Sequence, residues 1–90
     1  MRSFLMHLQK EYSMSLKQIG DMLKVTPSTV QRYLKGTAYP SPVMLSFLRG
    51  LELAESRCSR STYVRSLNSI VKYGWRTHIS VAMEHYVVHG

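Results

Sequence analysis

Residues 27–32 bring together side chains that are able to recognise DNA bases. Arg32 carries a guanidinium that can donate two parallel hydrogen bonds to N7 and O6 of guanine in the major groove. Gln31 and Ser28 supply an amide and a hydroxyl, and Pro27 could make an apolar contact, for instance with a thymine methyl group. We predict that these four residues contact bases. The alternative is a solvated helix face, which is the usual explanation for isolated Arg and Gln side chains.

Hydroxyl and ammonium groups flank this stretch, where they could bind phosphates and so position the protein on DNA. The predicted phosphate-contacting residues are Ser15, Lys17, Thr26, Thr29, Lys35, Thr37 and Tyr39. Two of them also have purely structural explanations, because Thr26 could serve only as a helix cap and Tyr39 only as a packing residue in a loop.

Catalysis and metal binding receive little support from the sequence. His85 and His89 are four residues apart and would share one face of a helix, and His78 precedes them. No cluster of Cys, Asp or Glu completes a tetrahedral metal site around them. The single cysteine, Cys58, lies in a polar stretch without a neighbouring His that could activate it. We therefore expect a protein that is not an enzyme and that requires no metal or cofactor.

Two short helical patterns meet between Ser15 and Gly36 and would position the candidate base-contacting residues. The first pattern has Ser15 as its N-cap, and its apolar residues share one helical face: Leu16, Ile19, Met22 and Leu23. The second begins with Thr26 as N-cap and Pro27 at the first helical position, and its inward residues are Val30, Tyr33 and Leu34. Gly20 lies where the two helices must approach closely. This arrangement predicts a helix-turn-helix.

The stretch from Ser15 to Leu51 resembles the DNA-binding unit of phage repressor and Cro-type regulators, the XRE-like helix-turn-helix class. The resemblance is carried by Ile19, Leu23 and Val25, by TPST at 26–29, by Gly36 and by Pro40-Ser41. It implies that the positions of Pro27, Ser28 and Arg32 reach base edges. Three positions depart from the class, which often has Gln, Ala and Gly where this chain has Leu16, Gly20 and Lys24. Leu16 removes one expected phosphate contact, and Lys24 strains a turn that favours positive φ.

Flanking helices must complete the core, because two short helices bury too little apolar surface to fold alone. One begins after Ser3, and its apolar residues are Phe4, Leu5, Leu8 and Tyr12. Another begins at Ser41-Pro42, and its apolar residues are Val43, Met44, Phe47, Leu48 and Leu51. Leu45 and Leu53 fall outside this second stripe, which suggests a covered interface.

The C-terminal third has a different pattern. Residues 56–61 are polar and predict a connection, and Tyr63, Leu67 and Ile70 predict a fifth helix that Gly74 would cap. From Trp75 to Met83 apolar and polar residues alternate, which favours a strand, although Trp75, Ile79, Met83 and Tyr86 also have helical spacing. An unpaired strand exposes donors and acceptors that pair in trans. We therefore predict a homodimer in which the dimerisation residues are Trp75, Ile79, Val81 and Met83.

The expected fold is mainly α, with four to five helices arranged as in repressors and a C-terminal dimerisation segment that includes the strand. Residues 1–55 would form the helix-turn-helix DNA-binding domain and residues 56–90 the dimerisation extension. Twelve Lys and Arg against five Asp and Glu give a net charge of +7, which favours a polyanionic partner. Five of these cations lie between residues 57 and 76, where they extend the DNA footprint or merely solubilise the surface.

The sequence thus predicts a sequence-specific DNA-binding transcriptional regulator, a repressor of phage or plasmid type that binds an inverted-repeat operator as a homodimer. The alternatives are an antitoxin or architectural DNA-binding protein, or an adaptor that binds proteins without specific DNA binding. No apolar run approaches the roughly 20 residues of a membrane span. The single cysteine fits a reducing compartment, so we expect a cytoplasmic protein with no membrane partner.

Overall fold

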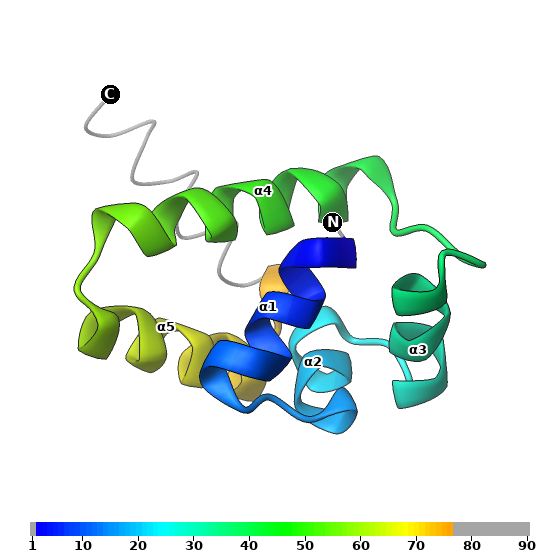
Figure 1. Cartoon of the computed structure of the whole chain (residues 1–90), viewed down its shortest axis with the longest axis horizontal. Coiled ribbons are helices and arrows are strands. Elements are labelled where there is room, and N and C mark those ends of the chain that lie inside the picture. Colours follow the sequence, from blue (N-terminus) through cyan, green and yellow to red (C-terminus); the bar gives the residue numbers. More distant parts are fainter. Residues whose placement is uncertain (1, 77–90) are drawn as a thin grey trace.

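A computed structural model describes residues 2–76 of the chain, which fold into five helices (Figure 1). The helices are α1 (Arg2–Tyr12), α2 (Leu16–Leu23), α3 (Pro27–Lys35), α4 (Pro42–Arg57) and α5 (Arg60–Tyr73). The described residues contain no strand. The prediction of a mainly helical protein is therefore confirmed. None of these helices between residues 2 and 76 is long and apolar enough to cross a membrane.

The predicted helix starts are present because a side-chain oxygen accepts from a free backbone amide at each of them. Ser15 accepts from the amide of Gln18, whose own side chain accepts from the Ser15 amide in return. Thr26 accepts from the amide of Thr29, and Ser41 accepts from that of Met44. Pro27 and Pro42 occupy first-turn positions, where a missing N–H costs nothing. The exception is α1, which begins at Arg2, so Ser3 lies inside the helix.

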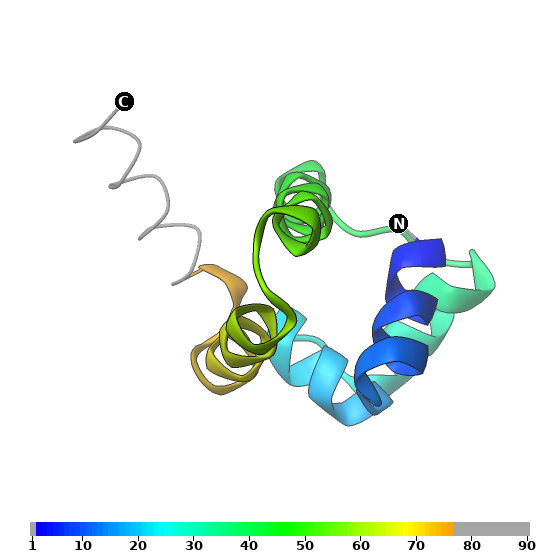
Figure 2. The ribbon, with the colours of Figure 1, turned by 60° about the vertical axis from the view of Figure 1, so that its left-hand side comes forward.

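One core joins all five helices. Helix α2 lies between α3 and α5 and packs against both, and α1 packs against α3. Figures 1 and 2 both show α3 on one side of the molecule and α5 on the opposite side. The fully buried side chains include Leu5 and Leu8 of α1, Ile19 and Met22 of α2, Val30 of α3, Leu48 of α4, and Tyr63 and Ile70 of α5. Residues on both sides of position 55 thus share this core.

The polar stretch 56–61 is mostly helical, contrary to the connection expected there. Helix α4 continues to Arg57, and Ser59 caps α5 by accepting from the amide of Thr62. The Ser59 cap starts α5 directly after α4, so Cys58 and Ser59 alone link the two elements.

The side chain of Val43, expected in the core, is instead 60% exposed on α4.

The predicted strand is absent at its first two residues, Trp75 and Arg76, and the rest of it lies outside the described residues. Trp75 and Arg76 have helical backbone, and the Trp75 side chain is only 4% exposed. Its ring centre lies 5.7 Å from that of Phe47 on α4. The reason is Gly74, which ends α5 with φ 90° and turns the chain so that Trp75 enters its own core. The other three predicted dimerisation residues, Ile79, Val81 and Met83, lie outside the described residues.

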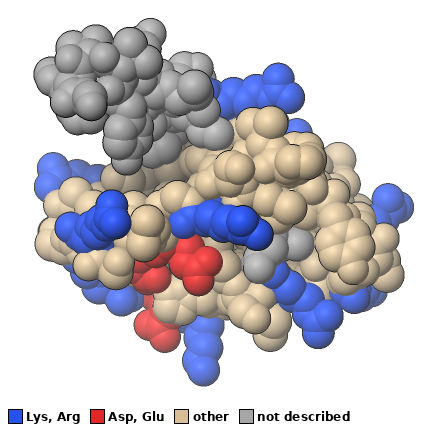
Figure 3. Space-filling view, turned by 90° about the horizontal axis from the view of Figure 1, so that it is seen from above, with Lys and Arg blue, Asp and Glu red and all other residues tan. Residues whose placement is uncertain are grey.

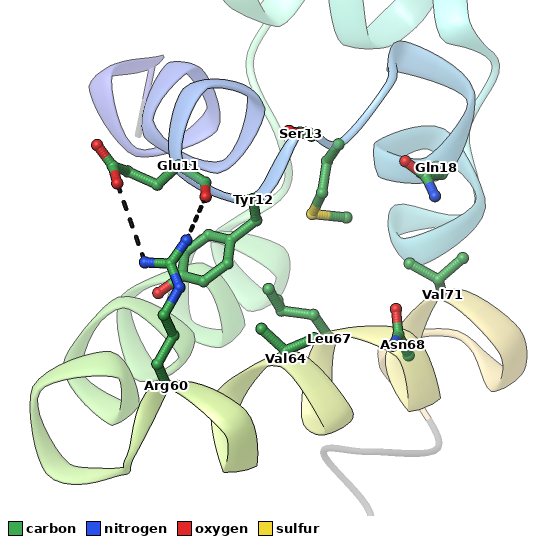
Figure 4. Close-up of a pocket in the computed structure, with 10 residues that line it drawn as sticks. Glu11, Tyr12, Ser13, Gln18, Arg60, Val64, Leu67, Asn68 and Val71 are labelled. Atoms are coloured by element: carbon green, nitrogen blue, oxygen red, sulfur yellow. Dashed lines mark hydrogen bonds and ion pairs between the residues drawn. The ribbon is translucent and has the colours of Figure 1, made fainter.

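Arg60 ties the start of α5 to the end of α1. Its guanidinium donates a hydrogen bond of 2.6 Å to the Glu11 carbonyl oxygen and lies 4.7 Å from the centre of the Tyr12 ring (Figure 4).

A cavity of about 300 Å³ opens beside Arg60, with Met14, Val64 and Leu67 among its lining residues. None of the lining residues comes from α3. Sequence reasoning did not find this cavity, because its walls are far apart along the chain.

Candidate DNA-binding surface

The turn between α2 and α3 is closed by a backbone contact that only glycine accommodates. A Cβ built on Gly20 would lie 2.6 Å from the Val25 carbonyl oxygen, closer than real Cβ contacts allow. The Val25 amide donates to the Gly20 carbonyl oxygen at 2.9 Å. This close approach, which the sequence predicted, sets the position of α3 relative to α2.

Lys24 has the positive φ that its position in the turn predicts. Its backbone is left-handed, with φ 59° and ψ 41°, which is uncommon for a residue with a Cβ. The methylene stem of Lys24 packs closely over Gly74. A Cβ built on Gly74 would lie only 2.5 Å from Lys24 Cε. The turn of the helix-turn-helix therefore rests on the end of α5.

Helix α3 presents the predicted base-contacting residues to solvent. Val30 and Tyr33 are buried and hold the helix against α1 and α2. The four candidates Pro27, Ser28, Gln31 and Arg32 are exposed. Among the described residues, Arg32 makes no ion pair with a carboxylate. The arrangement leaves one guanidinium, one amide and one hydroxyl exposed on one helix, where they are accessible to base edges.

The predicted phosphate-contacting residues fall into two groups. In the first group, side chains already bind a neighbour. Ser15 and Thr26 cap helices, the Thr29 hydroxyl lies 3.0 Å from that of Thr26, and Lys17 Nζ lies 3.3 Å from Asp21 Oδ2. Ser15 and Thr26 have a hydroxyl proton as well, so capping does not remove them as donors.

The second group is Lys35, Thr37 and Tyr39, all exposed after or at the end of α3. The Thr37 hydroxyl makes only a long hydrogen bond of 3.4 Å, to the Arg32 carbonyl oxygen. The Tyr39 ring is 78% exposed, so packing in the loop does not explain this residue. These three residues have the greatest freedom to meet a phosphate.

Arg2 is not among the residues that the sequence predicted to contact DNA, but the structure places it beside α3. A Cβ built on Gly36 would lie 3.5 Å from Arg2 Nη1, so this guanidinium lies over the C-terminal cap of α3. The contact joins the first residue of α1 to the C-cap of α3, which are far apart in the sequence. No local sequence pattern could have revealed it.

Charge by itself does not locate the DNA-binding surface. The face shown in Figure 3 has its Asp and Glu side chains close together in one small area, whereas Lys and Arg side chains lie all around its outline. The net charge of +7 attracts polyanions, but on this face the cations are not gathered into one patch.

The largest cluster of titratable groups between residues 2 and 76 joins α1 to α4. Glu55 accepts hydrogen bonds from the Tyr12 hydroxyl and from His7 Nε2, the latter at 2.8 Å. Burial alone would raise the pKa of Glu55, but the hydrogen bonds from Tyr12 and His7 outweigh it and lower that pKa. Burial and the Glu55 carboxylate together raise the pKa of Tyr12 to about 12.

This cluster holds α1 against α4 through the hydrogen bonds of His7 and Tyr12 to Glu55. In residues 2–76, no three His, Cys, Asp or Glu side chains are placed to hold a metal ion. His78, His85 and His89, which the sequence singled out, lie outside the described residues. Cys58 is exposed and forms no disulfide.

A comparison with protein families finds one match. Residues 8–48 match a helix-turn-helix family, a span that runs from the second half of α1 to the first half of α4. This match supports an XRE-like, DNA-binding transcriptional regulator. No curated protein and no solved structure matches the chain.

Proposed function

We propose that this protein is a sequence-specific repressor of phage or plasmid type, which occupies an inverted-repeat operator as a homodimer. The observation that carries the proposal is the exposed face of α3, which bears Arg32, Gln31 and Ser28 on a helix positioned by the close packing of its turn against Gly20. The family match over residues 8–48 supports DNA as the partner.

In this proposal α3 enters the major groove. Arg32 donates two hydrogen bonds to a guanine, Gln31 and Ser28 contact neighbouring bases, and Pro27 makes an apolar contact at the start of the helix. Lys35, Thr37 and Tyr39 bind phosphates past the end of α3, and Ser15, Lys17, Thr26 and Thr29 bind phosphates at its other side. Repression follows from occupancy, because a protein bound across a promoter excludes the polymerase.

A homodimer follows from the small number of base pairs that one recognition helix can read. Helix α4 offers one apolar surface for it, since Val43 and Leu53 are 60% and 52% exposed and a Cβ on Gly50 would meet nothing within 4 Å. Residues 56–90 supply the rest of the interface through Ile79, Val81 and Met83. Two-fold symmetry then requires half-sites about one helical turn, ~34 Å, apart.

Selection of bound sequences from random duplex DNA tests the proposal. We expect an inverted repeat to emerge, and we expect affinity for it to fall steeply as salt concentration rises, because binding releases counterions from DNA. Enrichment of no sequence, together with affinity that does not change with salt, would instead indicate an adaptor that binds proteins.

A further inference from the structure

We infer that Arg2 forms an additional phosphate-binding site at the C-terminal end of α3, together with Lys35 and Thr37. This inference rests on the proposed function, because it concerns the backbone of the same DNA. It adds a residue that lies outside the matched helix-turn-helix segment, residues 8–48.

The geometry places Arg2 at the edge of the recognition helix. Helix α1 packs against α3, and Figure 1 shows the start of α1 close to the end of α3. The Arg2 guanidinium lies over Gly36, whose left-handed backbone, φ 79°, ends α3. Lys35 precedes Gly36 and Thr37 follows it, so all three polar residues lie at one end of the helix and are exposed.

Among residues 2–76, no carboxylate forms an ion pair with the cations at this end of α3. The ion pairs among residues 2–76 join His7 to Glu55, Lys17 to Asp21 and Arg60 to Glu11. Arg2, Arg32 and Lys35 take part in none of them. The Arg2 guanidinium is well suited to bind a phosphate here, since its planar fork donates two parallel hydrogen bonds.

Backbone amides at the α3 cap are already used. The Gly36 amide donates to the Tyr33 carbonyl oxygen at 3.2 Å, and the Thr37 amide donates to the Arg32 carbonyl oxygen at 3.0 Å. A phosphate near this cap must therefore be bound by side chains. The side chain of Leu16, at the start of α2, packs against the core and offers no hydrogen-bond donor. A phosphate contact from Arg2 adds one donor at the C-terminal end of α3.

Helix stability does not explain an arginine at this position. Arg2 is the first residue of α1, and a positive charge in the first turn of a helix opposes the helix dipole. The side chain is exposed, so packing does not require it either. Replacing Arg2 should leave the fold intact, which makes a direct test practicable.

The test compares Arg2→Ala with Arg57→Ala, a second exposed arginine that ends α4 on the side of the molecule opposite α3 (Figure 1). Binding is measured by fluorescence anisotropy over a range of salt concentrations, with a duplex selected from random sequences and an unrelated duplex of equal length. For Arg2→Ala we expect both duplexes to bind about tenfold more weakly, as for loss of one charge-assisted hydrogen bond. The slope of log affinity against log salt should become shallower by about 0.9, the value for one phosphate. Arg2→Lys should retain that slope.

The inference is overturned if Arg2→Ala keeps the wild-type salt slope, if it matches Arg57→Ala, or if it weakens the selected duplex alone. Circular dichroism confirms that each variant is folded, and Arg2→Gln replaces Arg2→Ala should the latter unfold. A wild-type protein that binds neither duplex would refute the proposed function itself, which keeps the two failures distinct.

Discussion

The Tyr12 hydroxyl donates a hydrogen bond to Glu55, which links the last residue of α1 to the end of α4. His7, five residues earlier along α1, donates to the same carboxylate. Three helices meet at this point, because Arg60 of α5 lies over the Tyr12 ring, 4.7 Å from its centre. The ionised form of Glu55 is therefore part of what holds the fold together.

The depressed pKa of Glu55 predicts a loss of stability in acid. The unfolded chain binds a proton at the ordinary glutamate pKa, about 4.5, whereas the folded chain binds it only at lower pH. The stabilisation is present above that ordinary pKa and disappears as the pH falls through the folded pKa. Thermal unfolding followed between pH 7 and pH 3 measures it. Glu55→Gln should be less stable at neutral pH and less sensitive to acid, while Glu52→Gln should behave as wild type.

Arg32→Ala should remove preference for the operator and leave the fold unchanged. Loss of one bidentate contact to guanine costs about 1–3 kcal/mol of binding free energy and relaxes one position of the site. Competition between the operator and single-base variants measures the effect. Unchanged sequence preference would show that Arg32 is not a base-contacting residue.

Lys35→Ala should act differently, because an ammonium at the helix end contacts phosphate rather than base. We expect weaker binding to every duplex by the same factor and a shallower dependence of affinity on salt. Titrations with specific and unrelated duplexes at several salt concentrations provide the measurement. A change in the preferred base would contradict the division between base-contacting and phosphate-contacting residues.

Gly20→Ala should destabilise the protein, and Gly50→Ala provides a matched control. The Gly20 Cβ would meet the Val25 carbonyl oxygen at 2.6 Å, and overpacking of this kind costs about 1–3 kcal/mol. Gly50 lies in the middle of α4 with nothing within 4 Å of a built Cβ. Alanine there should therefore raise the free energy of unfolding by about 0.5–1 kcal/mol. Urea unfolding of both variants tests the pair, and equal effects would refute the close contact.

Two truncations separate folding from association in the C-terminal third. Removal of residues 77–90 should give a folded monomer that binds DNA weakly, because the proposed dimer loses Ile79, Val81 and Met83. Removal of residues 74–90 should in addition destabilise the fold, since it deletes Trp75 from its place against Phe47, and loss of such a buried ring costs about 3–5 kcal/mol. Light scattering and thermal unfolding measure the two effects. A monomeric full-length protein, or a dimeric 1–76 fragment, would contradict the proposed dimer.

Local chemistry in the sequence determined most of the helix-turn-helix. Thr26 followed by Pro27 defines a helix start through one hydroxyl and one fixed φ, and Gly36 defines its end through a left-handed backbone. The spacing of Val30 and Tyr33 then decides which side of α3 is buried, so the exposure of Arg32 could be predicted from its neighbours. These signals act over a few residues, which is why a single sequence contains them.

Tertiary structure decided the features that depend on distant contacts. The alternation after Gly74 is compatible with a strand, yet Trp75 enters the core because Phe47 of α4 lies opposite the end of α5. The position of Arg2 over Gly36 likewise depends on how α1 packs across α3. Period and propensity describe one element at a time, whereas the free energy of burying a ring or placing a cation depends on residues from another helix.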